Sequence, residues 1–344
     1  MRPSFFNHLH PPTIPAEQAR WRYTLGAGGT GVFLLLVVAA TGVLEMFYYV
    51  PTPDQAAVSV QTISYLVPFG GFVRNLHFWS AQLLVIVSAI HLGRVVFTGS
   101  YAPPRAFNYL LGLGLFVLSI LLDFTGYVLR WDQGVQWALV VGTNLIKTIP
   151  WLGNSLYVLL TGSSQLGLPT LIRFYAWHIF GLTLGVFILT VWHAFRVRRD
   201  GGIAVPPPPL RRNQKRISRH ELARREVAAM LFVGAALVLL SASLPAPIAA
   251  PIKDIAAVSG DARAPWFFLW VQQMLKWGDP FLLGVLVPLV LLAVLALIPY
   301  VLPKPVTAEL GRWFPRSNRL AQVVLAVIAA GILVLTIWGR LSTP

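Results

Sequence analysis

Seven apolar runs in this 344-residue sequence are each long enough to cross a lipid bilayer, which takes about 20 residues of helix. The runs occupy residues 25–50, 78–97, 109–129, 174–195, 227–244, 281–302 and 320–338. Hydrophobic residues form 56% of the chain and charged residues only 11%, too few for the surface of a soluble domain of this length. The sequence therefore predicts an all-α integral membrane protein with seven transmembrane helices.

Lysine and arginine are unevenly divided between the segments that join these runs. Of the 27 basic residues, 19 lie in the N-terminal segment and in every second connecting segment after it, on one side of the predicted membrane. Basic residues concentrate on the cytoplasmic side of membrane proteins, so we expect the N-terminus to be cytoplasmic. This topology also explains the net charge of +15, which needs no nucleic-acid partner.

Four of the seven histidines lie in or beside two of the apolar runs. His77 and His91 are 14 residues apart in one run, and His178 and His193 are 15 residues apart in another. Each pair therefore places two imidazoles near one face of a helix, at depths about 21 Å apart, because a helix rises 1.5 Å and turns about 100° per residue. The other three histidines lie in polar segments: His8, His10 and His220.

Both runs are expected to cross the membrane in the same direction, so His77 matches His178 near the outer side and His91 matches His193 near the inner side. Two facing imidazoles at one level form a bis-axial site for a haem iron. Zinc would need further Cys or carboxylate ligands at the same level, and none is evident. We therefore expect two haems b. The absence of cysteine excludes a haem attached through thioether bonds and an iron–sulfur cluster in this chain.

Glycines repeat the histidine spacing in two other runs. Gly28 and Gly42 are 14 residues apart, and so are Gly112 and Gly126. Glycine lacks Cβ and lets a flat macrocycle approach the helix backbone, so these glycines are expected to close the sides of the two haem sites. The alternative is ordinary close packing of membrane helices, in which small residues are common.

Three arginines are candidates to bind the anionic haem propionates. Arg74 and Arg173 lie within five residues of the outer histidines, and Arg94 follows the inner histidine His91 by three residues. The alternative for each is an interfacial arginine whose charged end reaches the polar surface of the membrane.

A basic, proline-rich segment with four consecutive prolines, 206–209, separates two groups of apolar runs. Such a segment is typical of an extended surface linker. The predicted parts of the chain are an N-terminal cytoplasmic-side segment (1–24), a four-helix bundle that holds two haems (25–200), the linker (201–226) and a three-helix C-terminal domain (227–344).

Three stretches carry a resemblance to a known family. They read R-N-L-H-F-W followed by H-L-G-R-V-V-F-T-G-S-Y in residues 74–101, T-G-Y-V-L-R-W-D-Q in residues 125–133 and R-F-Y-A-W-H in residues 173–178. These stretches resemble the cytochrome b family of bc and bf complexes, and the 15-residue histidine interval is similar to the chloroplast and cyanobacterial form. From about residue 224 the chain resembles the three-helix subunit that is a separate chain in bf complexes. The fused chain looks bacterial, which implies the inner (cytoplasmic) membrane of a bacterium.

The resemblance implies a subunit of a quinol:electron-acceptor oxidoreductase. In this family quinol is oxidised near the outer side, one electron passes to a Rieske iron–sulfur protein and a c-type cytochrome, and the other crosses to a quinone near the inner side. The resemblance also implies that two complexes form a dimer in the lipid bilayer and that they exchange quinol and quinone with the quinone pool of the membrane. The alternative is a di-haem electron conduit with a single quinone site, which serves a different peripheral redox partner without bifurcation.

The expected outer quinol site departs from the family pattern. The family's P-E-W-Y reads A-P-W-F at residues 264–267, so the glutamate that is thought to accept a quinol proton is missing. Trp266 and the helix that follows it are expected to keep the shape of the site. Two carboxylates within apolar runs, Glu45 and Asp123, are the candidates to accept the proton instead, since ionisable groups inside a membrane are often functional. The alternative for both is a structural role, or simple exposure at the interface for Glu45.

Overall fold

The computed structural model describes residues 11–211, 214–255 and 263–342, so His8 and His10 lie outside the described residues. Within these ranges, seven helical segments are long and apolar enough to cross a membrane, which confirms the predicted all-α membrane fold. They run over Ala27–Met46, Gly70–Phe97, Ala106–Leu129, Leu168–Arg199, Arg219–Ser243, Leu282–Val301 and Arg316–Leu341.

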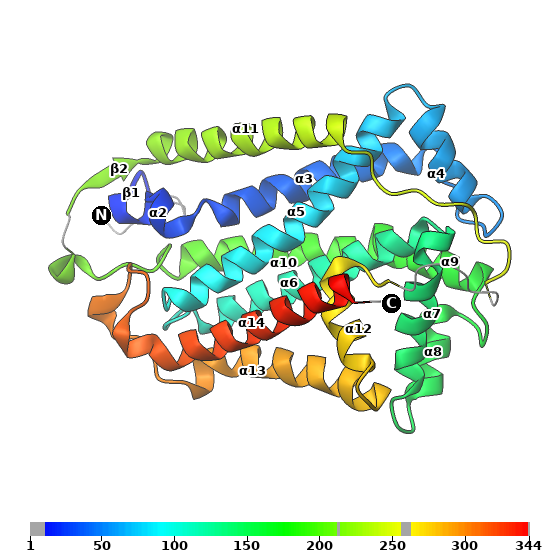
Figure 1. Ribbon diagram of the computed structural model, residues 1–344. Helices are drawn as coiled ribbons and strands as arrows, with labels where there is room; N and C mark the ends of the chain where they lie inside the picture. The colour runs from blue at the N-terminus through cyan, green and yellow to red at the C-terminus, as the bar shows by residue number, and fades with distance from the viewer. Residues whose placement is uncertain (1–10, 212–213, 256–262, 343–344) are drawn as a thin grey trace.

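A bundle of four membrane helices forms the centre of the molecule (Figure 1). Its members are α3 (Ala27–Met46), α5 (Gly70–Phe97), α6 (Ala106–Leu129) and α10 (Leu182–Arg199). Helix α3 packs along α5, and α6 packs along α10, so the bundle consists of two helix pairs. Their facing sides meet in a buried apolar cluster that includes Leu34, Leu84 and Val186. This packing fixes the helix faces that carry the histidines.

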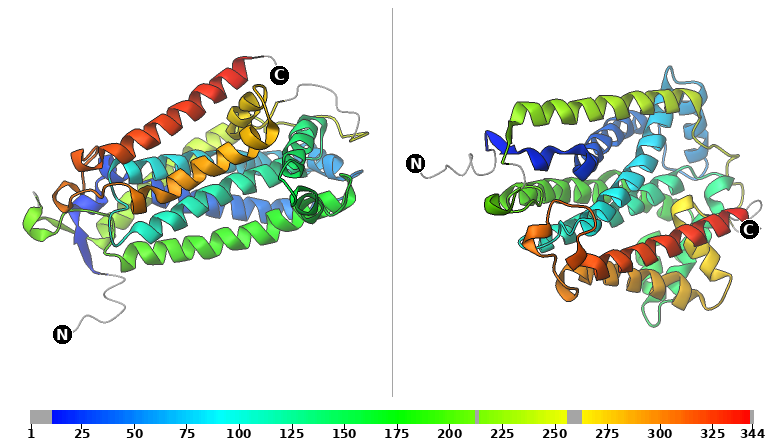
Figure 2. Two further views of the ribbon diagram at one scale, coloured as in Figure 1. Left: turned by 90° about the horizontal axis from the view of Figure 1, so that it is seen from below. Right: turned by 60° about the vertical axis from the view of Figure 1, so that its left-hand side comes forward.

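The three C-terminal membrane helices flank this bundle on two sides (Figures 1 and 2). They are α11 (Arg219–Ser243), α13 (Val287–Val301), which continues the π-helical turn η5 (Leu282–Leu286), and α14 (Arg319–Leu341). Helix α11 packs on α3 and α5, whereas α13 contacts α6 and α14 contacts α5. The Tyr109 hydroxyl of α6 donates a hydrogen bond to Leu295 O of α13, which ties this side to the bundle.

Short helices cover one end of the bundle, which we call the outer end (Figure 1, right). They are α4 (Ala56–Tyr65), α7 (Gln133–Lys147), α8 (Gly153–Thr161), η4 (Trp266–Phe268) and α12 (Leu269–Leu275). The remaining short turns are η1 (Ala16–Ala19), α2 (Trp21–Thr24), η3 (Pro208–Leu210), η6 (Thr307–Glu309) and η7 (Arg316–Asn318).

The fourth membrane segment is not a regular α-helix. Helix α9 (Leu168–Ala176) passes into a π-helical turn, η2 (Trp177–Gly181), before α10 begins. A π-turn holds one more residue than an α-turn. This turn contains His178, and the extra residue offsets the difference between the 15-residue interval to His193 and the 14-residue interval in α5.

A two-stranded antiparallel sheet marks the opposite end of the bundle, which we call the inner end. Strand β1 (Thr13–Pro15) pairs with β2 (Arg216–Ser218), so the predicted linker joins the N-terminal segment. Ser218 then caps α11, because its side chain accepts a hydrogen bond from the backbone N–H of Glu221. Helix α11 therefore begins eight residues before the predicted apolar run.

Candidate functional site

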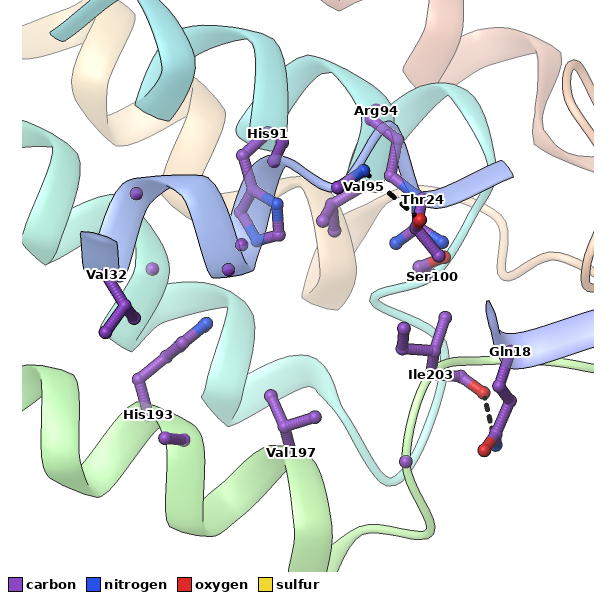
Figure 3. Close-up of a pocket in the computed structure, with 18 of the residues that line it drawn as sticks. Gln18, Thr24, Val32, His91, Arg94, Val95, Ser100, His193, Val197 and Ile203 are labelled. Atoms are coloured by element: carbon purple, nitrogen blue, oxygen red, sulfur yellow. Dashed lines mark hydrogen bonds between the residues drawn. The ribbon is translucent and has the colours of Figure 1, made fainter. Parts of the chain in front are cut away.

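The four histidines of the membrane helices lie in two facing pairs. The ring centres of His77 on α5 and His178 in η2 are 6.3 Å apart, with their planes at 65°. Those of His91 on α5 and His193 on α10 are 6.4 Å apart, with their planes at 78°. Figure 3 shows the second pair, in which the two rings extend toward each other from α5 and α10.

These separations suit a metal ion held between two axial imidazoles. A metal–imidazole nitrogen bond of about 2.0–2.1 Å places the ion roughly 3 Å from the ring centre, so two axial rings would lie about 6 Å apart. Both pairs match this spacing. The residues present therefore fit two bis-histidine sites at two depths.

Hydrogen bonds to Nδ1 orient three of the four rings. His77 Nδ1 lies 3.0 Å from Thr41 Oγ1, and this hydroxyl donates to Val37 O of its own helix, which leaves it free to accept the imidazole N–H. His193 Nδ1 donates to Asn108 O at 3.2 Å. Such contacts fix the ring tautomer and leave Nε2 available as a metal ligand.

The second outer histidine has the same arrangement on the other helix pair. His178 Nδ1 lies 3.0 Å from Thr125 Oγ1 and 3.1 Å from Leu122 O. Thr41 and Thr125 were not among the site residues predicted from the sequence. A signal for them existed, because each immediately precedes one of the two outer glycines in a Thr-Gly pair. By contrast, His91 Nδ1 is buried without a hydrogen-bond partner among the described residues.

Each of the four predicted glycines lies against one of the histidine rings. A Cβ built on glycine would lie 3.5 Å from the nearest ring atom at Gly28, 3.1 Å at Gly42, 3.2 Å at Gly112 and 2.7 Å at Gly126. The neighbouring rings are, in the same order, those of His91, His77, His193 and His178. The immediate role of these glycines is thus to give each imidazole room beside a helix. Contact of these glycines with a haem macrocycle stays a prediction.

A cavity of about 680 Å³ opens from the inner histidine pair toward the inner end. His91 and His193 lie on its wall (Figure 3). Gly28 and Gly112 line the same cavity. The polar residues that line it nearer the inner end include Gln18, Arg105, Arg198 and Arg219. This lining, with its polar and basic side chains nearer the inner end, suits a large planar group that has an apolar body and anionic substituents.

Arg94 supplies a buried positive charge to this cavity. Its Nε donates to Tyr23 O at 2.9 Å, and the guanidinium lies 4.2 Å from the centre of the Tyr23 ring. Its Nη2 is buried without a hydrogen-bond partner among the described residues, as is Asn108 Oδ1. A buried guanidinium with an unused donor calls for an anionic partner, which a haem propionate would provide.

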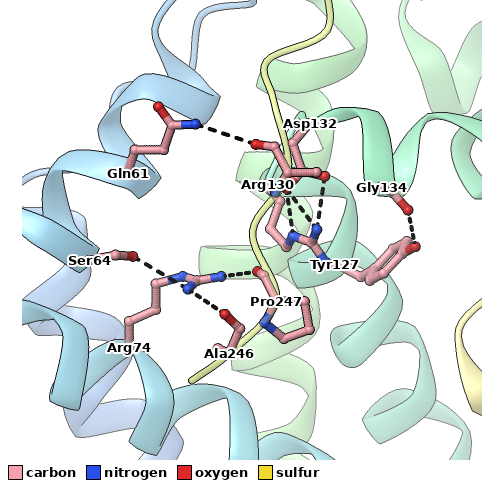
Figure 4. A network of polar contacts seen from close by, with 10 residues as sticks. Gln61, Ser64, Arg74, Tyr127, Arg130, Asp132, Gly134, Ala246 and Pro247 are labelled. Atoms are coloured by element: carbon pink, nitrogen blue, oxygen red, sulfur yellow. Dashed lines mark hydrogen bonds and ion pairs between the residues drawn. The ribbon is translucent and has the colours of Figure 1, made fainter. Parts of the chain in front are cut away.

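The two arginines predicted near the outer histidines already have protein partners. The guanidinium of Arg74 is buried and donates to Ala246 O at 3.2 Å and Pro247 O at 2.6 Å (Figure 4). Arg173 donates to Leu159 O at the end of α8. A propionate at the outer site would therefore share or displace these contacts, and propionate binding by either residue stays a prediction.

Of the candidates for the outer quinol site, the structure connects Asp123 and Trp266. Trp266 Nε1 donates to Gln82 Oε1 at 2.6 Å, and Gln82 Nε2 donates to Asp123 Oδ1 and Oδ2 at 2.8 and 3.0 Å. Glu45 takes no part in this series of hydrogen bonds. It lies close enough to Arg74 to interact with its charge, and its Oε1 is buried without a hydrogen-bond partner among the described residues.

A buried ion pair fixes the segment that leads from α11 to η4. Arg130 donates three hydrogen bonds of 2.7–3.0 Å to the carboxylate of Asp132, which is only 2% exposed (Figure 4). Asp132 Oδ2 also accepts from the backbone N–H of Ala249 at 3.0 Å. Together with Arg74, this pair holds residues 246–249 between α5 and the end of α6.

Comparison with known proteins assigns this arrangement to a family. The family model described as cytochrome b/b6/petB matches residues 14–201. Cytochrome b6 of Heliomicrobium gestii is 37% identical over 192 residues, which are 56% of this chain and 88% of that protein. Cytochrome b6 of Synechocystis sp. is 37% identical over 174 residues, which are 51% of this chain and 78% of that protein.

The likeness in fold extends into the C-terminal helices. A solved structure titled hyperthermophilic respiratory Complex III superposes with a TM-score of 0.80 and covers 94% of this chain and 85% of its own. The two sequences are 19% identical, so this match concerns the fold.

Proposed function

The chain belongs to the cytochrome b family, and from this premise we propose that it is the di-haem subunit of a quinol-oxidising complex of the bc/b6f type. It would pass electrons across the membrane between an outer quinol site and an inner quinone site. The observation that carries this proposal is the pair of facing histidine couples at separations of 6.3 and 6.4 Å. Haem b supplies an iron that gains and loses single electrons.

In this proposal the chain's own residues hold and tune the two haems. His77 with His178 and His91 with His193 ligate the irons, and hydrogen bonds to Nδ1 keep three rings in the ligating tautomer. Arg94 neutralises a propionate at the inner site. The membrane spans exclude water from the space between the sites. Moving one charge across the membrane is worth about 2.3 kcal/mol per 100 mV, so transfer between two depths conserves energy.

The proposed partners follow from the family. A Rieske iron–sulfur protein and a c-type cytochrome would accept electrons on the outer side, quinone and quinol would come from the membrane pool, and two complexes would associate as a dimer. The chain would lie in a bacterial inner membrane with its N-terminus in the cytoplasm. The proposed division is into residues 1–24, 25–200, 201–226 and 227–344, with all four haem ligands in the second part.

One observation favours the alternative of a conduit with a single quinone site. Pro265 stands where the family places the glutamate of its quinol site, and proline cannot accept a proton. A conduit without bifurcation would not need that acceptor. Trp266 and its contact with Gln82 favour the leading proposal, because a conduit has no use for a shaped outer quinol site.

Bifurcation can be tested directly on the purified native complex. With the inner quinone site blocked by an inhibitor and quinol present, a pulse of oxidant should transiently reduce haem b, because removal of the first electron sends the second to the haem. A Rieske signal in the electron paramagnetic resonance spectrum should accompany it. If the oxidant only oxidises haem b and no iron–sulfur signal is found, the single-site conduit is the correct function.

A further inference from the structure

Gln82 connects two residues from distant parts of the sequence at the outer end. The residue lies on α5, five positions inward of His77, and its side chain is buried at 8% exposure. Its amide oxygen accepts from Trp266, 184 residues away, and its amide nitrogen donates to Asp123 on α6. No spacing in the sequence predicts this contact.

The chemistry of the two neighbours fixes the orientation of the Gln82 amide. An indole N–H only donates, so the amide oxygen must face Trp266. The amide N–H₂ then faces Asp123 and donates to both carboxylate oxygens, at 2.8 and 3.0 Å. Trp266 thus holds Gln82 in the orientation that supports an ionised Asp123, the form that can accept a proton.

Asp123 has little other support within the described residues. Among those residues its carboxylate accepts hydrogen bonds from Gln82 alone and takes part in none of the ion pairs. A carboxylate in a membrane helix that is paired with one neutral amide is costly to keep ionised. Among the described residues, no paired cation therefore competes with a proton for this carboxylate.

A series of aromatic rings links the residue that follows Asp123 to η4. Phe124, the next residue to Asp123, lies 5.5 Å from the ring of Phe268, which lies 4.9 Å from that of Phe267. The ring of Phe267 lies 5.7 Å from that of Trp266. This cluster offers an apolar aromatic surface, suited to a quinol ring, beside a group that can take its proton.

We propose that Asp123 accepts a proton from quinol at the outer site and that Gln82, held by Trp266, is its positioning residue. The inference rests on the proposed function. Quinol loses two protons and two electrons to become quinone: one O–H bond breaks as an O–H bond forms on Asp123, and the second proton leaves to the outer solvent. The electrons go to the iron–sulfur and haem acceptors of that function. Asp123 thereby replaces the glutamate missing at position 265.

Glu45 fits this role less well. Among the described residues, its carboxylate makes no hydrogen bond to Gln82, Asp123 or Trp266.

The test compares Asp123→Asn, Asp123→Glu and Gln82→Leu complexes with Asp54→Asn, a matched control at an exposed carboxylate of the outer end. Reduction of haem b by a short-chain synthetic quinol, with the inner site inhibited, should slow at least 10-fold in Asp123→Asn, because general base catalysis contributes about 10²–10⁴-fold. Asp123→Glu should recover part of the rate, and the control should match the wild type. Unchanged haem content and midpoint potentials would confirm that the variants assemble.

An infrared difference spectrum of quinol-treated against oxidised complex supplies a readout that a structural role would not change. A protonated carboxyl C=O band should appear in the wild type, vanish in Asp123→Asn and move to higher frequency in Gln82→Leu, which lacks the donor. The Gln82→Leu shift decides the matter even if Asp123→Asn fails to assemble. An unshifted band there, or an Asp123→Asn complex as fast as the wild type, would overturn the inference. A wild type without oxidant-induced reduction of haem b would instead refute the proposed function.

Discussion

A Cβ atom on Gly126 would lie 2.7 Å from Cε1 of His178, closer than real side chains approach. Helix α6 can hold its neighbour η2 at this distance only because residue 126 has no side chain. The contact is the tightest of the four between a glycine and a histidine, since the distances at the other three sites are 3.1–3.5 Å. The outer site therefore tolerates less change than the inner one.

Gly126→Ala should displace the His178 ring and cost the complex its outer haem, or lower the occupancy of that haem several-fold. Gly28→Ala, with a Cβ at 3.5 Å from His91, should have a smaller effect on the inner haem. Gly114→Ala is the matched control on α6, because its nearest contact is 3.8 Å from a leucine methyl. Pyridine haemochrome quantification per chain measures the outcome. Full haem content in Gly126→Ala would contradict this prediction, because it would show that α6 and η2 can move apart to accommodate a Cβ atom without loss of haem.

Thr41→Val should raise the midpoint potential of the outer haem. Without the hydroxyl, the His77 Nδ1–H loses its acceptor, the imidazole becomes a weaker electron donor and the oxidised iron is less stabilised. A hydrogen bond worth about 0.5–1.5 kcal/mol corresponds to roughly 20–60 mV for one electron. Thr125→Val should shift it less, because Leu122 O remains as a second acceptor for His178.

The control for both threonines is Thr336→Val, whose hydroxyl bonds only within its own helix α14. Spectroelectrochemical titration measures the potentials of both haems. A shift of the inner haem alone, or a fall in the outer potential, would contradict the assignment of these threonines to the outer site.

Arg94→Gln should lower the midpoint potential of the inner haem, because loss of a nearby positive charge makes the added electron less favourable. A unit charge about 10 Å away at an effective dielectric constant of about 20 contributes about 1.7 kcal/mol, or roughly 70 mV. Arg94→Lys keeps the charge and should recover much of the potential. Arg224→Gln, whose side chain is 84% exposed, is the control. An unchanged inner potential in Arg94→Gln would show that Arg94 only anchors Tyr23.

Asp132→Ala should destabilise the outer end of the protein by about 3–5 kcal/mol, since it leaves Arg130, whose side chain is only 12% exposed, without its partner. The double variant Arg130→Leu with Asp132→Ala should be less destabilised than the single one, because it removes the unpaired charge as well. Thermal release of haem from the detergent-solubilised complex provides the measurement, with Asp54→Asn as control. If Asp132→Ala and the control released haem at the same temperature, the prediction would be wrong, and water would have to solvate Arg130 in the variant.

The membrane fold could be predicted from the sequence because each apolar run is a local signal of a bilayer-spanning helix. Helix ends were harder to predict. Helix α11 starts at Arg219, outside the apolar run, because Ser218 caps it and β1 pairs with the preceding strand. Amphipathic α7 and α8 at the outer end carry no membrane-length apolar run and were not predicted.

The histidine positions followed from spacing, but the register of His178 did not. An ideal helix leaves an offset of about 60° over 15 residues, and the π-turn at Trp177–Gly181 is what absorbs the extra residue. Glycine is needed within that turn, because a Cβ at Gly181 would lie 2.5 Å from the Trp177 ring. Spacing arguments assume a regular helix and therefore cannot detect such a turn.

The role of Gln82 could not be predicted, since it depends on contacts between three distant segments. A single glutamine in an apolar run has no periodic partner, and its neighbours Asp123 and Trp266 are 41 and 184 residues away. Only the packing of α5, α6 and η4 brings the three side chains together.

A potentiometric titration of the α-band of the purified complex, with pyridine haemochrome quantification, tests the central claim most directly. Two b-type haems per chain with separated midpoint potentials, the outer lower than the inner, are the expected result. Only one haem per chain, or none, would contradict the pairing of His77 with His178 and of His91 with His193 as ligands, and with it the proposed transmembrane electron path.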